Sequence, residues 1–304
     1  MPAYRYDGRA DCDMDLDLSG LSGKTAVVTG GANGIGEAYV RALVDAGVRV
    51  CFGDLDVESG RELEKELSGT KFVKCDTTFW EDQVKLFDEA KSFSNNGGIH
   101  YVVANAGITK QDDVFAYDES GPKKPDLKII DVNIHGVMYT AKLASHHFVT
   151  QNGQVETRQQ EDTCLVLISS GAGYLDCPRA PQYQASKYGM RGIMHSLRRV
   201  VHHYGSRVNI IAPWYVETKI LSKAAFDEVK SLGVEFATLE DAGQCLLRIV
   251  SDKSLNGHSL FLSPRKWAPR GYFDLGLDDY EDELMKEITA DQLKGSRAEE
   301  VLFL

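Results

Sequence analysis

The chain has 304 residues, of which 43% are hydrophobic, and this suits one large α/β domain with appendages or two small domains. Its formal net charge of −11 argues against a general nucleic-acid partner, because such partners require a basic face. No apolar run approaches the roughly 20 residues of a membrane-spanning helix, and the start of the sequence lacks the apolar core of a secretion signal. We therefore expect a cytoplasmic protein without a membrane partner.

Six cysteines are spread along the chain without C-x-x-C spacing. Cys51, Cys75 and Cys164 lie in apolar, strand-like segments, and we expect reduced thiols rather than disulfides or a zinc site. The histidine pairs at 146–147 and 202–203 have no carboxylate or cysteine nearby in sequence to complete a ligand set. No metal site is predicted.

The chain begins with an acidic, weakly patterned segment at residues 1–21, which we interpret as a flexible arm. Strands are then predicted at 25–29, 48–52, 71–75, 99–103, 164–168, 208–212 and 259–262, and helices at 37–46, 57–67, 80–93, 127–150 and 183–204. Strands that alternate with long helices predict an α/β fold, a single Rossmann-type doubly wound domain. It would have about seven parallel strands with helices on both faces.

The turn after the first strand is rich in glycine, at Gly30, Gly34 and Gly36. Such a turn lets the backbone approach a pyrophosphate, which also meets the positive N-terminus of the next helix. Asp54 closes the second strand, where a carboxylate can bind the adenosine ribose hydroxyls and repel a 2′-phosphate. The alternative for Asp54 is a turn or helix-capping residue. The pattern predicts a dinucleotide site that prefers NAD over NADP.

Tyr183 and Lys187 are four residues apart on a predicted helix and therefore share one face. A cation about 4 Å away, at an effective dielectric near 20, contributes on the order of 4 kcal/mol. This is roughly three pKa units, about what a phenol needs to act as a base near neutral pH. The spacing alone usually indicates an ordinary solvated helix face, so the surrounding motifs decide the interpretation.

Several motifs occur together in one order along the chain. They are Thr29-Gly30-x-x-x-Gly34-x-Gly36, Asn105-Ala106-Gly107, Asn133, Ser170, Tyr183-x-x-x-Lys187 and Asn209-x-x-x-Pro213. In this order they resemble the short-chain dehydrogenase/reductase family over roughly residues 22 to 263. Within the family, the chain resembles NAD-linked alcohol dehydrogenases of the 15-hydroxyprostaglandin dehydrogenase type and fungal secondary-metabolism members of the 5′-hydroxyaverantin dehydrogenase type.

The resemblance implies an oxidoreductase with four catalytic residues, Asn133, Ser170, Tyr183 and Lys187. Tyr183 would exchange a proton with the substrate oxygen, and Ser170 would donate a hydrogen bond to that oxygen. Lys187 would lower the pKa of Tyr183 and hold the nicotinamide ribose, while Asn133 would hold a water. The hydride would pass between the substrate carbon and the nicotinamide ring.

The resemblance also implies a set of cofactor contacts. These are Gly30, Asn33, Gly34, Ile35, Gly36, Asp54, Asp76, Thr77, Asn105, Ala106, Gly107, Tyr183, Lys187, Pro213, Val216 and Thr218. The chain departs from the family pattern at Trp214, where glycine is usual. An indole here would narrow the nicotinamide side or wall the substrate pocket.

The class of substrate is predicted from apolar side chains near the expected site. Mainly apolar side chains gather at Tyr174 and Leu175 and after Pro213, at Trp214, Tyr215, Ile220, Leu221, Ala225 and Phe226. They indicate a small hydrophobic secondary alcohol or ketone, unless some of them belong to the core. The alternative function is a non-redox cofactor-binding protein, such as a regulator, scaffold or cyclase. The presence of all four catalytic residues argues against it.

The expected organisation has three parts. The flexible arm at 1–21 precedes a dinucleotide-binding catalytic domain at 22–263, which includes a substrate loop at 214–240. A C-terminal extension at 264–304 carries aromatic side chains and is expected to pack on the body or at a subunit interface. In relatives two long helices pair between subunits, which implies a homodimer or homotetramer.

Overall fold

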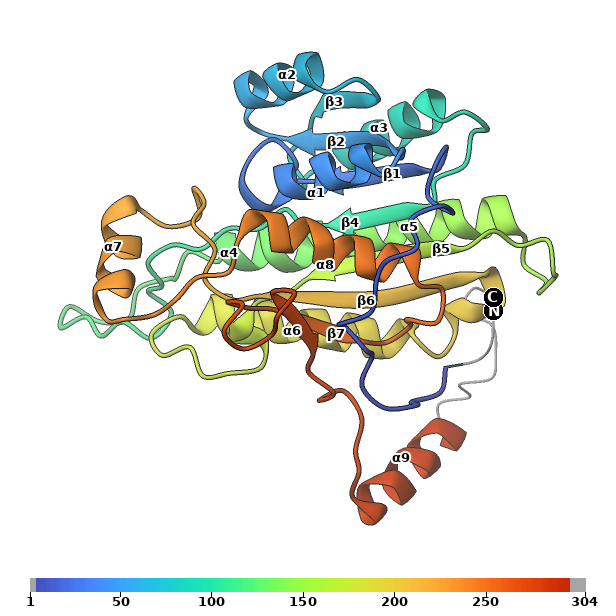
Figure 1. Cartoon of the computed structure of the whole chain (residues 1–304). Helices are drawn as coiled ribbons and strands as arrows, with labels where there is room; N and C mark the ends of the chain where they lie inside the picture. Colours follow the sequence, from blue (N-terminus) through green and yellow to red (C-terminus); the bar gives the residue numbers. More distant parts are fainter. Residues whose placement is uncertain (1–3, 296–304) are drawn as a thin grey trace.

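The computed structural model of the protein describes residues 4–295, which form one α/β body around an eight-stranded sheet (Figure 1). The strand order is β3-β2-β1-β4-β5-β6-β7-β8. The strands are β1 (Thr25–Thr29), β2 (Arg49–Asp54), β3 (Thr70–Lys74), β4 (Tyr101–Ala104), β5 (Thr163–Ile168), β6 (Ser206–Pro213), β7 (Ser259–Leu262) and β8 (Tyr272–Asp274). β1 to β7 pair in parallel, which confirms the predicted doubly wound fold. β8 is an addition to the prediction, since it pairs antiparallel with β7 at the edge of the sheet.

The strand order reverses beside β1, which pairs with β2 on one side and β4 on the other. Chain segments leaving β1 and β4 therefore diverge to opposite faces and open a crevice beyond their carboxyl ends. The residues of β1, β4 and β5 are all buried, as expected for parallel strands covered on both faces. This crevice is where a ligand is expected.

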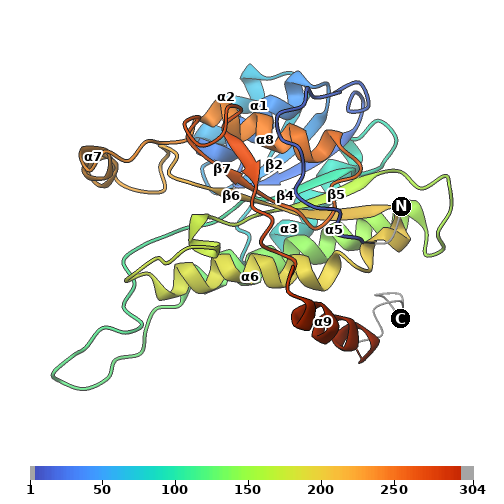
Figure 2. The same cartoon turned by 60° about the horizontal axis from the view of Figure 1, so that its bottom comes forward.

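Helices cover both faces of the sheet, as Figures 1 and 2 show. One face carries α1 (Gly34–Asp45), α2 (Val57–Glu66) and α8 (Leu239–Ser251). The other carries α3 (Trp80–Phe93), α5 (Val137–Asn152) and α6 (Pro181–Leu197). α8 lies so close to α1 that a Cβ on Gly243 would be 2.9 Å from the Cβ of Ala42. Each apolar helix face thus completes one of two cores separated by the sheet.

Two predicted helices differ in detail. The segment expected as one helix over 127–150 is α4 (Lys128–Ile130), a π-helical stretch at Asp131–Gly136, and then α5. α6 ends at Leu197, and a 3₁₀ turn over Val201–Tyr204 follows. Gly205, in the left-handed region at φ 66, then leads the chain into β6. The hydrophobic periodicity is nearly continuous across both irregularities, so the sequence pattern did not reveal them.

The described part of the N-terminal segment, residues 4–21, contacts the body of the protein at several points. Cys12 and Leu21 are buried, and the backbone N–H of Ala10 donates to Asp274 Oδ2 at 2.8 Å. The buried guanidinium of Arg248 donates to the carbonyl of Asp11 at 3.0 Å. Scattered apolar residues and satisfied backbone groups hold the segment against the α1/α8 face, despite its acidic composition.

Part of the C-terminal extension lies on the body. Asp278 contacts Arg191 and His195 on α6 at 3.0 and 3.1 Å, and Asp279 contacts Arg198 at 3.0 Å. Beyond these contacts α9 (Glu283–Gly295) has no buried residue and stands apart from the body in Figure 2. Residues 296–304 of the predicted extension lie outside the described residues.

Two further observations concern residues 4–295. All six cysteines have free thiols, and five of them are buried. Across these residues, no helix combines the length and apolar character that crossing a membrane requires.

Candidate active site

A cavity of about 780 Å³ lies beyond the carboxyl ends of the central strands. It is lined by every residue predicted above to contact the cofactor, from Gly30 to Thr218, and by Ser170. The fourth predicted catalytic residue, Asn133, does not line it. The fold therefore gathers these residues from turns after β1, β2, β3, β4, β5 and β6 into one space.

The glycine turn requires glycine for two different reasons. Gly30 and Gly34 lie in the left-handed region, at φ 64 and 59. A Cβ on Gly36 would lie 1.9 Å from the carbonyl oxygen of Gly30, so α1 packs directly on the turn. Asn33 precedes α1 without capping it through its side chain. The first N–H groups of α1 are thus left for a ligand, and an anion such as pyrophosphate fits there.

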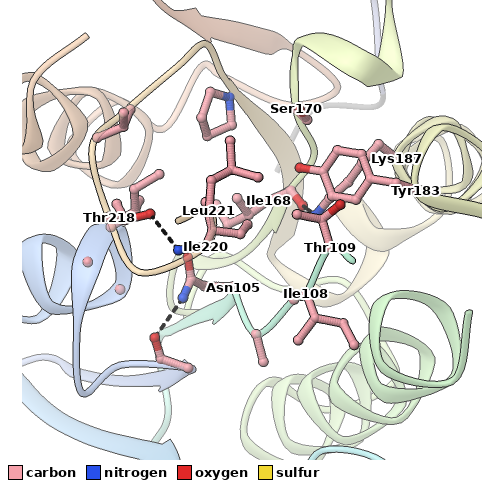
Figure 3. A pocket seen from close by; sticks show the side chains of 18 of the residues that line it. Asn105, Ile108, Thr109, Ile168, Ser170, Tyr183, Lys187, Thr218, Ile220 and Leu221 are labelled. Atoms are coloured by element: carbon pink, nitrogen blue, oxygen red, sulfur yellow. Dashed lines mark hydrogen bonds between the residues drawn. The ribbon is translucent and has the colours of Figure 1, made fainter. Parts of the chain in front are cut away.

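Asn105 fixes the turn from the neighbouring strand. Its side-chain N–H group donates to the carbonyls of Thr29 at 3.0 Å and Gly30 at 2.8 Å. In return the Thr29 hydroxyl accepts from the backbone N–H groups of Asn105 and Ala106, both at 3.1 Å. Figure 3 shows Asn105 at the floor of the cavity. Because its side chain is engaged in this network, any ligand contact here falls to the exposed backbone of 105–107.

Asp54 ends β2 and also supports the turn. Its Oδ2 accepts from the backbone N–H of Ala32 and its Oδ1 from that of Asp56, each at 3.0 Å. Each carboxylate oxygen retains a second lone pair. The residue lines the cavity, so this capacity faces the place where an adenosine ribose would lie.

The reactive end of the cavity holds Ser170, Tyr183 and Lys187, which Figure 3 shows on one side of the space. Pro181 occupies the start of α6 and preorganises its first turn, which carries Tyr183. The Ser170 hydroxyl lies on the same side of the cavity as the phenol of Tyr183 and lowers the pKa of that phenol. The ammonium of Lys187 donates to the carbonyl of Ile168 at 3.1 Å and lies 5.5 Å from the centre of the Tyr183 ring.

Burial controls the protonation of this pair. It raises the pKa of Tyr183, and the nearby hydroxyl of Ser170 offsets this rise only in part. Burial also lowers the pKa of Lys187 to about 8. Besides burial, the neighbouring Cys177 and Tyr215 raise the pKa of Tyr183. Both groups are therefore biased towards their neutral forms.

Asn133 lies behind the cavity, in the π-helical stretch. Its Oδ1 accepts from the backbone N–H of Ile108 at 2.9 Å, and its Nδ2 donates to Ile108 O at 3.0 Å and to Ser186 Oγ at 3.1 Å. A Cβ on Gly107 would lie 3.4 Å from both Asn133 Oδ1 and Lys187 Nζ. The side chain thus braces the loop after β4, next to the lysine.

The expected substrate end is mainly apolar, with Leu175, Tyr215, Ile220, Leu221 and Phe226 in its lining. Trp214 also lines it, and its indole N–H donates to Glu235 O at 3.2 Å. The indole ring lies edge-on to Tyr215 and Trp267, with centroids 5.0 and 5.4 Å apart. Trp214 is therefore a fixed wall.

Tyr174 was expected to face the substrate but does not line the cavity. Its phenol donates to Ser259 Oγ at 2.6 Å, and the guanidinium of Arg191 lies over its ring. Tyr174 therefore belongs to the packing of α6 against β7. Ala225 also lies outside the lining.

The sequence patterns missed several lining residues. They are Leu55, Cys75, Ile108, Thr109, Lys128, Val132, Ile168, Ser169, Gly171, Ala172, Asp176, Cys177, Ala180 and Lys219. Most are neighbours of predicted residues. Ile108 and Thr109 continue the Asn-Ala-Gly motif, and Lys219 follows Thr218. Extending each motif by a residue would have found Ile108 and Lys219, and Asp176 follows the predicted Leu175, whereas nothing in the pattern marked Lys128.

A parallel sheet with a glycine turn at its switch point defines a Rossmann-type, nucleotide-binding class of protein. The family profile "short chain dehydrogenase" matches residues 24–228, and the chain belongs to this family of oxidoreductases. The sequence is 35% identical over 290 residues to the 5′-hydroxyaverantin dehydrogenase of Dothistroma septosporum, which covers 89% of this chain and 92% of the relative. The resemblance to the fungal 5′-hydroxyaverantin dehydrogenase type is thereby confirmed.

One further relative is named for its cofactor. The 5′-hydroxyaverantin dehydrogenase of Emericella nidulans is 30% identical, over 89% of this chain and 92% of the relative. An NADP-dependent dehydrogenase of Cochliobolus lunatus is also 30% identical, over 83% of this chain and 93% of the relative. The relatives therefore leave the choice between NAD and NADP open.

Solved structures show the same fold. A 3-ketoacyl-(acyl-carrier-protein) reductase from Brucella melitensis, complexed with NADH, has a TM-score of 0.69 at 21% identity, covering 80% of this chain and 97% of that chain. A short-chain type dehydrogenase/reductase from Mycobacterium marinum has a TM-score of 0.68 at 21% identity, covering 79% and 94%. At this identity they establish the fold alone.

Proposed function

We propose that the protein is a short-chain alcohol dehydrogenase or ketoreductase that transfers a hydride between a nicotinamide cofactor and a hydrophobic secondary alcohol or ketone, with NAD preferred over NADP. One observation carries the proposal. The hydroxyls of Ser170 and Tyr183 line the same cavity as the glycine turn and Asp54. Groups that can donate a proton and a turn that can hold a dinucleotide therefore lie in one cavity.

The residues of the cavity fit a nicotinamide dinucleotide. The uncapped N-terminus of α1 would hold the pyrophosphate, and the free lone pairs of Asp54 would accept from the adenosine ribose hydroxyls. Asp76 and Thr77 would flank the adenine, and the backbone of 105–107 would line its ribose. Pro213, Val216 and Thr218 would frame the nicotinamide. When bound, the nicotinamide donates or accepts the hydride.

The chain's own residues would handle the proton. In ketone reduction, Tyr183 would give its phenolic proton to the substrate oxygen, and its raised pKa keeps that proton available at neutral pH. Ser170 would donate a hydrogen bond to the same oxygen and stabilise the developing charge. Lys187, held by Ile168 O, would bind the nicotinamide ribose. In alcohol oxidation the proton would move in the opposite direction.

The cavity supports a hydrophobic substrate, because apolar side chains and the fixed indole of Trp214 surround the end beside Tyr183. The names of the fungal relatives support a role in secondary metabolism. Assembly as a homodimer or homotetramer and a cytoplasmic location remain predictions.

A second candidate is a cofactor-binding protein without redox turnover. The neutral bias of Tyr183 and Lys187 is the observation that favours it, since a phenol with a raised pKa is a poor base for oxidation. The two candidates predict the same NADH binding but different turnover.

The test measures NADH absorbance with a panel of apolar secondary alcohols and ketones. We expect turnover with wild type, loss of turnover in Tyr183→Phe, and nearly unchanged NADH binding by that variant. The control is Tyr188→Phe, on the same helix but outside the cavity lining. A Tyr183→Phe enzyme that keeps a tenth of the rate contradicts the mechanism. NADH binding without turnover on any substrate favours the second candidate.

A further inference from the structure

The segment that follows β6 crosses the mouth of the cavity. Val216 forms a β-bridge with Ala237. Two residues later Thr218 lies against the start of α1, where a Cβ on Gly34 would be 3.2 Å from the Thr218 side chain. Figure 3 shows Thr218 on the side opposite Tyr183. The segment therefore reaches from the end of β6 to the glycine turn.

Lys219 follows Thr218, and its side chain extends towards the end of β2. Its Nζ lies 3.2 Å from Oδ2 of Asp56, the residue that caps α2, and Lys219 lines the cavity. Its backbone follows Thr218 at the N-terminus of α1, and its ammonium reaches the N-terminus of α2. In a fold of this class the pyrophosphate lies at the first helix and the adenosine ribose at the end of the second strand. The side chain of Lys219 spans the interval between these two places.

We propose that Lys219 is a further cofactor-binding residue whose ammonium contacts the pyrophosphate of the dinucleotide. The inference rests on the proposed function. A pyrophosphate carries about two negative charges, whereas a helix N-terminus offers roughly half a positive charge. The glycine turn contains no basic side chain, and the first turn of α1 carries the acidic Glu37. The pyrophosphate thus needs a cation from elsewhere.

Three lysines line the cavity within the described residues, Lys128, Lys187 and Lys219. Lys187 is held at Ile168 O, beside Tyr183 and away from the glycine turn. Lys128 begins α4, on the other side of the switch point. Lys219 is the one that pairs with Asp56, and it directly follows Thr218, whose side chain lies against Gly34.

The ion pair between Lys219 and Asp56 can give way to a contact between Lys219 and a phosphate. The side chain of Lys219 is 69% exposed, and ion pairs in this setting contribute little. Asp56 keeps other partners when the lysine leaves, because its carboxylate accepts from the backbone N–H of Ser59 at 3.1 Å and from its hydroxyl at 2.8 Å. A doubly charged diphosphate forms the stronger charge-assisted bond and would draw the ammonium from the single carboxylate.

The experiment compares Lys219→Gln, Lys219→Arg and a matched control, Lys230→Gln. Lys230 pairs with Glu217 in the same segment but does not line the cavity. The dissociation constants of NADH and ADP-ribose are measured by fluorescence and calorimetry at low and high salt. We expect Lys219→Gln to raise both by about tenfold at low salt, with a weaker salt dependence. Adenosine binding, Lys219→Arg and Lys230→Gln should change by less than about threefold.

Asp56→Asn separates phosphate binding from a purely structural link. It removes the negative charge but keeps an oxygen that can cap α2. If Lys219 binds the pyrophosphate, this variant binds NADH as well as wild type or better. If Lys219 only ties the segment to α2, Asp56→Asn weakens NADH binding as much as Lys219→Gln does, and the inference is overturned.

Three other outcomes also test the role of Lys219 or the proposed function. Unchanged NADH binding in Lys219→Gln overturns the inference but leaves the proposed function intact. A loss confined to NADPH shows that the lysine serves a 2′-phosphate and overturns it as well. Wild-type protein that binds neither NADH nor ADP-ribose overturns the proposed function itself.

Discussion

The side-chain amide of Asn133 pairs with both backbone groups of Ile108. Its Oδ1 accepts from Ile108 N at 2.9 Å and its Nδ2 donates to Ile108 O at 3.0 Å. The same Nδ2 donates to Ser186, which lies on α6 between Tyr183 and Lys187. Asn133 is 1% exposed. One amide therefore joins the π-helical stretch, the loop after β4 and the helix that carries the tyrosine.

Replacing Asn133 by Ala should destabilise the protein and slow it. The substitution leaves the backbone groups of Ile108 without their partner, at a cost of about 1–3 kcal/mol. Urea unfolding measures the loss, and kcat should fall in parallel because Ile108 and Lys187 are no longer braced. Asp131→Asn, in the same helical stretch, changes a half-exposed side chain that pairs with the exposed His135, and should alter stability by less than about 0.5 kcal/mol. An Ala variant as stable as wild type contradicts the bracing role.

Adjacent serines at the end of β5 should have separate roles. Ser170 lines the cavity on the same side as Tyr183 and would donate to the substrate oxygen, so Ser170→Ala should lower kcat by about 10²-fold or more with little effect on stability. The buried hydroxyl of Ser169 donates to the carbonyl of Lys187 at 2.8 Å. Ser169→Ala should therefore cost about 1 kcal/mol of stability. Steady-state kinetics and urea unfolding of both variants make the comparison, and equal activity losses would show that Ser170 has no special role.

The central strands could be predicted from sequence because their burial follows directly from unbroken apolar runs such as 164–168. The motifs follow the ends of these strands, so most residues of the candidate site could be predicted as well. β8 could not be predicted, since its three residues pair only because the edge of β7 is open. The π-helical stretch was also hidden, because Asn133 looks like any helical residue until Ile108 is placed beside it.

The packing of the termini depends on long-range contacts that composition does not encode. Asp11 looked like one of several solvated acids, yet its carbonyl accepts from Arg248, 237 residues away. Tyr174 was assigned to the substrate side on sequence proximity, but its partner is Ser259 on β7. Burial raises the pKa of Tyr183, and this desolvation by the folded surroundings has no signature in a four-residue spacing.

The rate of ketone reduction should fall as the pH rises through about 8. Burial lowers the pKa of Lys187 to about 8, so its positive charge is complete below that pH and is lost above it. The raised pKa of Tyr183 keeps the phenolic proton in place over the same range. A loss of activity over this range therefore reports the deprotonation of Lys187. The measurement is kcat/KM for a ketone between about pH 6 and about pH 10. Circular dichroism over the same range checks that the protein stays folded. A rate that increases through pH 8 contradicts the assignment.

Asp54 should set the preference for NAD. Removing its charge relieves the repulsion of a 2′-phosphate, and Asp54→Asn should shift the ratio of kcat/KM for NADP over NAD upward by about tenfold. Overall efficiency should drop, because an amide cannot accept from both Ala32 and Asp56 N–H groups through oxygen. Asp45→Asn, at the far end of α1, makes the same change in net charge and should leave the ratio unchanged. A wild-type enzyme that is more efficient with NADP overturns the assignment.

Trp214 should act on substrate binding more than on the chemical step. Its indole is fixed by Glu235 O and by the rings of Tyr215 and Trp267, so it forms a preorganised wall. Trp214→Gly removes apolar surface that a hydrophobic substrate would cover, at roughly 25 cal/mol per Å². Loss of about 60 Å² of contact then raises KM by about tenfold.

Trp214→Phe tests whether the wall or its hydrogen bond matters. Phenylalanine keeps a ring against Tyr215 and Trp267 but loses the bond to Glu235 O, so KM should rise by less than about threefold. Steady-state kinetics with a bulky and a small secondary alcohol make the measurement. The effect of Trp214→Gly should be larger for the bulky substrate, because more of its surface lies against the indole. If the glycine variant instead binds the bulky alcohol more tightly, Trp214 obstructs the cavity rather than lining it, and the hydrophobic wall is not what selects the substrate.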